Sequence, residues 1–119
     1  MIFIIKYIIY KLNDSKDEIV VGKTSEAIGH DTFLEDLPEN KYRWAVYNFE
    51  YTQGEGVNSK FLFISWLPEN VTSQERMLYM WGKDTLRSKL SGIAIEFTAT
   101  DFDEISYESV LDKATRSTV

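Results

Sequence analysis

The sequence predicts one α/β (α+β) domain that contains a single sheet, and three observations support this. The 119 residues are enough for one hydrophobic core but hardly for two. Five short segments are rich in β-branched and aromatic residues, and three others place apolar residues at helical spacing. Hydrophobic residues form 44% of the chain and charged residues 27%, which is typical of a folded globular protein.

The first predicted strand is the opening segment MIFIIKYIIYKL. A secretory signal or a membrane span is also apolar, but Lys6 and Lys11 interrupt this run, and a span needs about 20 mostly apolar residues. Asn13 and Asp14 then form a polar turn, and residues 19–21 make a second apolar run. We expect these two strands to pair as a hairpin.

A short helix is expected next, within TSEAIGHDTFLEDLPEN. Phe33, Leu34 and Leu37 fall on one helical face, and Pro38 ends the segment. His30 stands near the start of this helix, where we expect it to face solvent.

Two longer strands follow, joined by the glycine-bearing turn QGEGVNS. The third strand is predicted in KYRWAVYNFEYT, which carries Trp44, Val46, Phe49 and Tyr51. The fourth is predicted in KFLFISW and is closed by Pro68.

The segment from Asn70 to Gly92 predicts the longest helix. Thr72 precedes Glu75 by three residues, the spacing at which a hydroxyl and a carboxylate cap each other's main-chain N–H groups. The helix is expected to run to Ser91, with Gly92 in the left-handed conformation that ends many helices.

This helix is predicted to have an apolar face and a cationic face. Arg76, Lys83 and Arg87 fall in a narrow stripe that we place opposite the apolar face, and Gly82 indicates a bend or close packing at mid-helix. The apolar face consists of Leu78, Tyr79, Leu86 and Leu90.

The last two elements are a strand in GIAIEFTATD and a helix in DEISYESVLDKATRSTV. Ser106 is the expected helix cap, and Val110 and Leu111 are expected to face inward. The outward residues are expected to be Asp112, Lys113 and Arg116.

The residue inventory argues against most catalytic sites. His30 is the single histidine and cysteine is absent, so histidine-based triads, disulfides and thiolate metal sites lack their parts. The glycines of residues 54–56 have no Lys-Ser/Thr partner and read as a turn, not a phosphate loop. The carboxylates of Asp101, Asp103 and Glu104 precede a helix, where acidic residues usually act as caps.

Composition also indicates compartment and partners. The absence of cysteine and of a signal peptide favours a reducing, cytoplasmic environment. The formal net charge of −6 argues against binding nucleic acid or acidic membranes by bulk charge. A local basic patch remains compatible with this charge.

Several motifs in register resemble the actin-depolymerising factor/cofilin family, particularly its fungal members. They are KYIIYKLND, TFLEDLPEN with RWAVYNFEYT, FISWLPE, KDTLRSKLSGI and TDFDEISYESVLDK, and they extend from about Lys6 to Arg116. The resemblance implies a mixed five-stranded sheet with helices on both faces. It also implies a protein without enzymatic activity or cofactor that binds actin monomers and filaments, severs filaments and speeds subunit loss from pointed ends.

The resemblance implies that the long helix inserts beside a cleft between two actin subdomains. Cations beside flexible methionines suit an acidic partner surface, since they combine electrostatic steering with adaptable packing. Without the resemblance, a charge stripe of this kind is more often a solvated helix face. The implied contacts are Arg76, Met77, Met80, Lys83, Asp84 and Arg87.

A second, filament-specific surface is implied by the resemblance, and here the chain departs from its relatives. The turn before the fourth strand has Val57 and Asn58 where relatives carry a basic pair, and Gln74 stands where many have arginine. The residues that match the filament surface are Lys60, Asp112, Lys113 and Arg116.

The resemblance further implies binding of phosphatidylinositol bisphosphate through Lys83, Arg87 and Lys89, in competition with actin. It places the protein in the cytoplasm on the actin cytoskeleton, with cortical patches and a nuclear pool as finer locations. Nucleic acid is not an implied partner.

Relatives carry a further helix and a tail with a regulatory serine before the first strand, so residues 1–119 are interpreted as an N-terminally truncated cofilin-like domain. Losing a covering helix exposes large side chains at about 1.5–3 kcal/mol each. We expect either self-association of the domain or partial cover by Ile2, Phe3, Ile4 and Ile5.

Two alternatives to a severing protein follow from the same residues. The first is a monomer-sequestering or degenerate variant that does not sever, because Gln74, Val57 and Asn58 depart from the family pattern. The second is a small enzyme, since fold alone does not decide function.

Overall fold

A computed structural model of the chain describes residues 5–26 and 29–116. The five predicted strands and three predicted helices are all present in it. In chain order they are β1 (Tyr7–Leu12), β2 (Ile19–Ser25), α1 (His30–Glu35), β3 (Arg43–Gln53), β4 (Gly56–Trp66), α2 (Ser73–Arg87), β5 (Ile93–Ala99) and α3 (Tyr107–Arg116).

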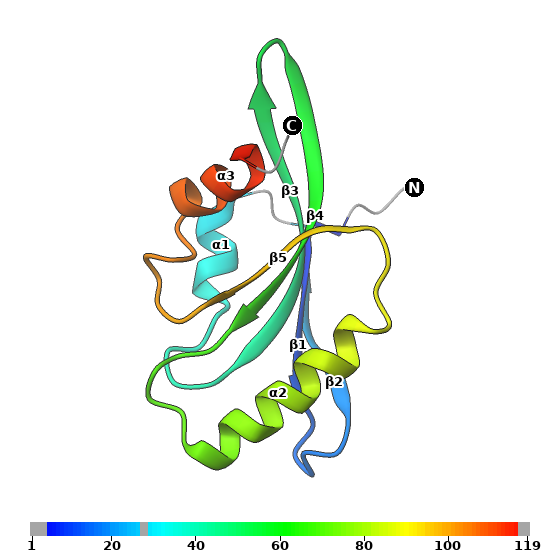
Figure 1. The fold of residues 1–119 in the computed structure, drawn as a ribbon, viewed down its shortest axis with the longest axis vertical. Coiled ribbons are helices and arrows are strands. Elements are labelled where there is room, and N and C mark those ends of the chain that lie inside the picture. Colours follow the sequence, from blue (N-terminus) through cyan, green and yellow to red (C-terminus); the bar gives the residue numbers. More distant parts are fainter. Residues whose placement is uncertain (1–4, 27–28, 117–119) are drawn as a thin grey trace.

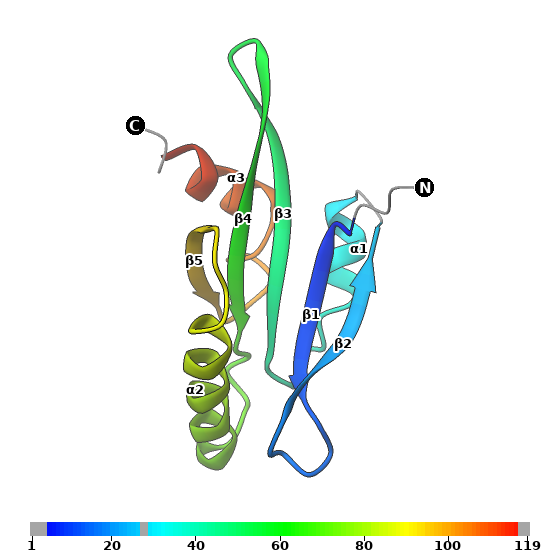
Figure 2. The ribbon, with the colours of Figure 1, turned by 90° about the vertical axis from the view of Figure 1, so that its right-hand side faces the viewer.

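The strands form one mixed sheet in the order β2-β1-β3-β4-β5. The pairs β1–β2, β1–β3 and β3–β4 are antiparallel, whereas β5 lies parallel to β4. A parallel neighbour requires a crossover connection, and α2 provides it. The β3–β4 hairpin extends beyond the other strands (Figures 1 and 2).

Helices cover both faces of the sheet, which confirms the expected fold class. On one face α1 and α3 lie near each other, and α2 crosses the other face (Figure 1). Residues of β3 alternate between the two layers, so Tyr47 packs with Phe33 of α1 while Trp44 packs with Tyr79 of α2. Trp44, Tyr47 and Phe33 are almost fully buried.

Some element ends differ from the prediction. β4 begins at Gly56, four residues earlier than Lys60, because the turn is tight and Gly54 takes a φ of +65°. α2 ends at Arg87 instead of Ser91. The N–H groups of Lys89 and Leu90 then bond to carbonyl oxygens three residues earlier instead of four. Gly92, with a φ of +77°, lies in the connection to β5.

The opening segment enters the sheet later than predicted. β1 begins at Tyr7, although the main chain of Lys6 already bonds to Ser25 and Asn48 on both sides. Ile5 is 46% exposed, so it is not a core residue. The predicted cover by Ile2, Phe3 and Ile4 falls outside the described residues.

The prediction that His30 faces solvent is wrong. Its ring is half-buried, with Nε2 2.8 Å from the carbonyl oxygen of Ile105 and Nδ1 3.3 Å from the hydroxyl of Tyr47. The ring also meets Tyr107 edge-on. His30 therefore joins α1 to β3 and to the start of α3.

No helix in residues 5–26 and 29–116 combines the length and apolarity that crossing a bilayer requires. The same residues contain no group of three or more histidine or acidic side chains arranged to hold a metal ion. Glu104 instead accepts a hydrogen bond from the main-chain N–H of Thr100, and Asp101 accepts one from the N–H of Glu104. These carboxylates act as local caps, as the sequence predicts.

Candidate functional site

The long helix α2 starts where its capping signal predicts. The N–H of Glu75 donates to Thr72 Oγ1 and the N–H of Thr72 donates to Glu75 Oε1, both at 3.1 Å. The hydrogen bonds from Thr72 hold the pKa of Glu75 below its usual value. A defined first turn sets which α2 side chains face the sheet and which face solvent.

The inner side of α2 lies very close to the sheet. Tyr79, Gly82 and Leu86 are buried, and a Cβ built on Gly82 would stand 2.4 Å from two ring atoms of Trp44. Close packing, one of the two predicted roles of Gly82, is therefore the observed one. Glycine lets the helix axis approach an aromatic ring that any larger side chain would push away.

The outer side of α2 exposes large apolar side chains. Met77 is 74% exposed, Met80 51% and Trp81 45%. Asp84 lies exposed next to them on the same side, and we name Met77, Met80, Trp81 and Asp84 the α2 crest. Exposed apolar patches of this kind usually mark interaction sites.

Trp81 is the crest residue that the sequence reasoning missed. It follows Met77 by four residues, so both lie on one side of the helix. That spacing was visible in the sequence. Trp81 adds a large side chain of a type that often dominates binding interfaces.

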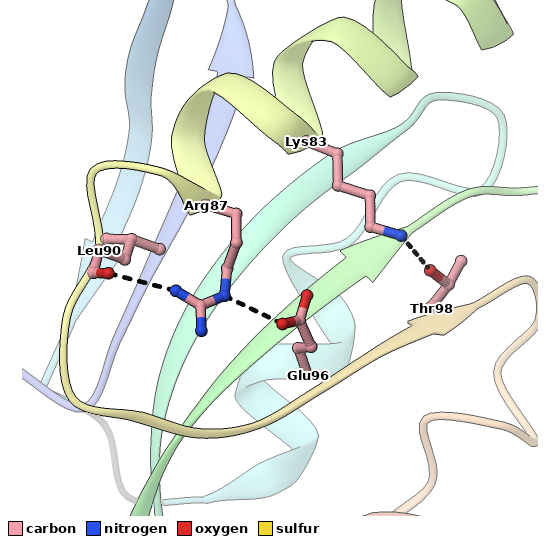
Figure 3. A network of polar contacts seen from close by, with 5 residues as sticks. All are labelled: Lys83, Arg87, Leu90, Glu96 and Thr98. Carbon is pink, nitrogen blue, oxygen red and sulfur yellow. Dashed lines mark hydrogen bonds and ion pairs between the residues drawn. The ribbon is translucent and has the colours of Figure 1, made fainter.

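The predicted cations line one flank of α2 instead of the side opposite its apolar face. Lys83 and Arg87 are half-buried and extend toward β5 (Figure 3), whereas Arg76 is exposed. Our prediction of an opposite stripe is wrong because the three residues lie beside Tyr79, whose hydroxyl reaches Thr98 of β5 at 3.2 Å. We name Arg76, Lys83 and Arg87 the basic row.

The basic row is partly engaged with β5. Lys83 Nζ donates to Thr98 Oγ1 at 3.4 Å, and Arg87 Nε lies 3.1 Å from Glu96 Oε1 (Figure 3). Arg87 also donates to the carbonyl oxygen of Leu90. The Arg87–Glu96 pair is substantially exposed, and exposed ion pairs contribute only about 0–1 kcal/mol. A partner could therefore replace the β5 contacts of Lys83 or Arg87 at a small cost in free energy.

The residues predicted for the filament surface come together on the other side of the sheet. Lys60 Nζ donates to the carbonyl oxygen of Ala114, which joins β4 to α3. Asp112 and Arg116 form an exposed ion pair at 2.9 Å. Lys113 was expected to point outward, but it is half-buried and lies 4.9 Å from the ring centre of Phe97.

The three predicted phosphoinositide residues do not form one cluster. Lys83 and Arg87 face β5, whereas Lys89 is exposed and lines a groove with Tyr10 and Trp81 on the β1–β2 side of α2. Any shared ligand would have to reach across the end of the helix.

The sequence profile described as cofilin/tropomyosin-type actin-binding protein matches residues 4–115. The chain belongs to this family. It is 49% identical over 112 residues to the cofilin of Schizosaccharomyces pombe, covering 94% of this chain and 82% of the relative. Over 115 residues it is 51% identical to the cofilin of Ogataea parapolymorpha, covering 95% and 80%.

A solved structure agrees with the membership. The crystal structure of Streptomyces griseoflavus cofilin superposes with a TM-score of 0.89 at 47% identity and covers 94% of this chain and 83% of that one. The cofilin family consists of cytoplasmic, actin-associated proteins that are not enzymes. The expected family, fold class and absence of catalytic function are thereby confirmed.

Proposed function

We propose that this cofilin-family protein binds actin monomers and filaments and promotes filament severing and depolymerisation. The observation that carries the proposal is the α2 crest, in which Met77, Met80 and Trp81 are exposed on the outer side of a helix whose β5 flank carries the basic row. Exposed methionine and tryptophan side chains add no stability to the protein by itself, so we expect them to be buried against a partner.

The two kinds of residue have different roles in the proposed contact. The crest residues supply area that is removed from water, and methionine adapts its shape to an irregular cleft. The basic row supplies attraction to an acidic partner surface, which mainly raises the association rate and fixes orientation. Lys83 and Arg87 would exchange their β5 contacts for acidic groups of actin.

Filament binding requires a second surface, and we assign it to Lys60, Asp112, Lys113 and Arg116. The α3 side of the sheet faces away from α2, so the second surface could contact one actin subunit while the crest contacts its neighbour (Figure 1). A protein must contact two neighbouring actin subunits at once to change how they pack against each other. This second surface would thus separate filament remodelling from simple monomer binding.

Charge-reversal variants test the assignment. Lys83→Glu with Arg87→Glu should lower the affinity for both monomers and filaments at least about tenfold, because attraction becomes repulsion. Lys89→Glu makes a matched change at an exposed lysine outside the basic row. Monomer binding is measured by fluorescence and filament binding by co-sedimentation. Unchanged binding in the double variant would contradict the assignment.

A variant of the second surface should separate the two activities. Asp112→Ala with Arg116→Ala removes an exposed ion pair, so the free energy of unfolding should change by less than about 1 kcal/mol. Monomer affinity should be retained while co-sedimentation with filaments and severing decrease. Equal loss of monomer binding would show that the two surfaces do not act separately.

A monomer-binding protein that does not sever is the second candidate. The observation in its favour is the tip of the β3–β4 hairpin, where Val57 is 75% exposed and no cation stands at Val57 or Asn58. Single-filament microscopy distinguishes the two candidates. Filaments that shorten only from their ends in the presence of the protein, without internal breaks, would favour the second.

Phosphatidylinositol bisphosphate is the further ligand that we assign to Lys83, Arg87 and Lys89, with cortical patches and a nuclear pool as the finer locations. Binding there would compete with actin for the basic row. Co-sedimentation with filaments should therefore fall when vesicles containing this lipid are added, and remain unchanged with vesicles of phosphatidylcholine alone.

A further inference from the structure

A polar pocket lies at the end of the molecule where α2 begins. Its volume is about 210 Å³, and it is formed by the β1–β2 turn, the segment leading into β3 and the first turn of α2. None of its wall residues belongs to the α2 crest, the basic row or the filament surface. The wall consists of Lys11, Leu12, Asn13, Asp14, Lys16, Lys41, Tyr42, Arg43 and Glu75.

The pocket is positively charged in a protein that is acidic as a whole. The chain carries a net charge of −6, yet the wall combines four cations with two carboxylates. This gathers nearly a third of the 13 lysines and arginines of the chain in one small concavity. Like charges held close together repel one another, so such a cluster costs stability unless an anion joins it.

The pocket cations have no ion pair within the described part of the chain, where the paired cations are Lys23, Arg87 and Arg116. The carboxylate of Glu75 is close enough for lysines to lower its pKa, but it accepts the N–H of Thr72 in the helix cap. The two wall carboxylates offset half of the four positive charges, so the pocket keeps a formal charge of about +2.

The remaining positive charge of the pocket matters most for Arg43. Its guanidinium is half-buried and donates to the carbonyl oxygen of the adjacent Tyr42 at 2.7 Å. Burial lowers the pKa of Arg43, which reflects the cost of removing this charge from water. The remaining N–H groups of the planar fork suit an oxyanion that accepts two parallel hydrogen bonds.

Lys16 is held in place by an unusual main-chain conformation. Its φ is +60°, a region that residues other than glycine seldom occupy, and its N–H donates to the carbonyl oxygen of Asn13 at 3.0 Å. The side chain of Asn13 accepts the N–H groups of Asp17 and Glu18, which fixes the whole turn. The main chain of Lys16 is therefore fixed in the turn, while its exposed side chain is free to reach a ligand in the pocket.

We propose that this pocket binds a phosphate-bearing anion with at least two negative charges. Phosphoryl oxygens match the fork of Arg43, and the lysines neutralise the remaining charge as point cations. The small volume favours one or two phosphoryl groups over a large organic molecule. Glu75 precedes Arg87 by 12 residues, or about 18 Å along α2, so the site is separate from that end of the basic row. Arg76 follows Glu75 directly, but its guanidinium donates to the carbonyl oxygen of Glu69 and it is not part of the pocket wall.

Inorganic pyrophosphate is the probe for the test, and binding is followed by calorimetry and by amide chemical shifts of the whole chain. The largest shifts should fall on Lys16, Lys41 and Arg43. Lys16→Gln with Lys41→Gln should weaken binding at least about tenfold, because two charge-assisted contacts are lost. The matched pair Lys60→Gln with Lys113→Gln, two lysines of the filament surface, should change it less than about twofold.

The source of the phosphate is distinguished with vesicles of phosphatidylcholine that contain phosphatidylinositol bisphosphate. Vesicle binding is compared in proteins that also carry Lys83→Gln, Arg87→Gln and Lys89→Gln, because the proposed function assigns those residues to the same lipid. If the Lys16/Lys41 change then removes both pyrophosphate and vesicle binding, the ligand of the pocket is a lipid headgroup. If it loses pyrophosphate alone, the ligand is soluble. The absence of pyrophosphate binding, or equal weakening in both double variants, would overturn the proposal, with melting temperatures confirming that each variant is folded. Actin binding should survive Lys16→Gln with Lys41→Gln, which keeps this test independent of the proposed function.

Discussion

Replacing Gly82 by alanine is expected to destabilise the protein, although alanine is the better helix former. Gly82 lies in the middle of α2 and faces Trp44, which is completely buried. The ring of Trp44 stacks on Tyr79 at a centroid distance of 6.2 Å and is also close to Tyr42. The indole therefore has neighbours that restrict its movement.

Two opposing effects set the magnitude. Alanine improves intrinsic helix stability by about 1 kcal/mol relative to glycine. The new Cβ would stand 2.4 Å from the indole, 1.0 Å inside the 3.4 Å at which ordinary van der Waals contact begins. Forcing extra volume into a filled core costs about 1–3 kcal/mol, and a rigid ring belongs near the upper end. We therefore expect a net loss of about 1–2 kcal/mol, or roughly 5–10 °C in Tm.

Urea unfolding and thermal melting measure this change. Gly56→Ala is the matched control, because a Cβ at Gly56 meets nothing within 4 Å and the substitution should be neutral or slightly stabilising. A double-mutant cycle with Trp44→Phe adds a direct test, since the smaller ring should relieve the clash. A Gly82→Ala protein that melts above the parent would refute the reasoning.

Two further predictions concern local interactions. Burial works to raise the pKa of Asp36, but hydrogen bonds from Lys23 and Tyr7 outweigh it and hold this pKa below the usual 3.8. The carboxylate of Asp36 binds a proton more readily in the unfolded chain than in the folded one, so its ionised form stabilises the fold. This stabilisation is complete above about pH 4 and is lost as pH falls below 3.8 through the folded pKa. Asp36→Asn should therefore lower the free energy of unfolding by about 1–2 kcal/mol at pH 7 and should flatten its acid dependence in urea titrations. Thr72→Ala removes the cap of α2 and should cost about 1 kcal/mol, whereas Ser73→Ala one residue later should be close to neutral; equal values would argue against the cap.

Elements that depend on neighbouring residues were predictable from the sequence. Thr72 and Glu75 bond to each other within one turn, so their spacing alone located the start of α2. Ser106 likewise accepts the N–H of Ser109 at the start of α3, as expected. Inward-facing Val110 followed from the helical period.

Contacts between distant residues were not predictable in the same way. The partner of His30 is Ile105, 75 positions later, and no local pattern indicates that a half-buried ring will bond there. Lys83 follows Tyr79 by four residues, so the helical spacing already put it beside the apolar face, and the predicted opposite stripe misread that spacing. The contacts of Lys83 and Arg87 with β5, in contrast, are not contained in the spacing. A helical wheel shows angles around an axis but not which strand lies beside each angle.

The candidate site was predictable to a similar degree. The crest methionines and the long helix were named from residues and resemblance, whereas Trp81 was missed although its spacing from Met77 indicated the same side of the helix. The charged pocket around Arg43 depends on three segments that meet in space. Such a site has no sequence signature, because its cations are separated by irregular intervals.

The placement of α2 and α3 on opposite faces of one continuous sheet has a mechanical consequence. Any force between partners held at the two surfaces passes through β3 and β4, which share an eleven-residue antiparallel register, and through the aromatic layers on both of their sides. No hinge or linker stands in this path within residues 43–66. If partners are held at both surfaces, the thickness of this sheet and its two aromatic layers would set the spacing between them.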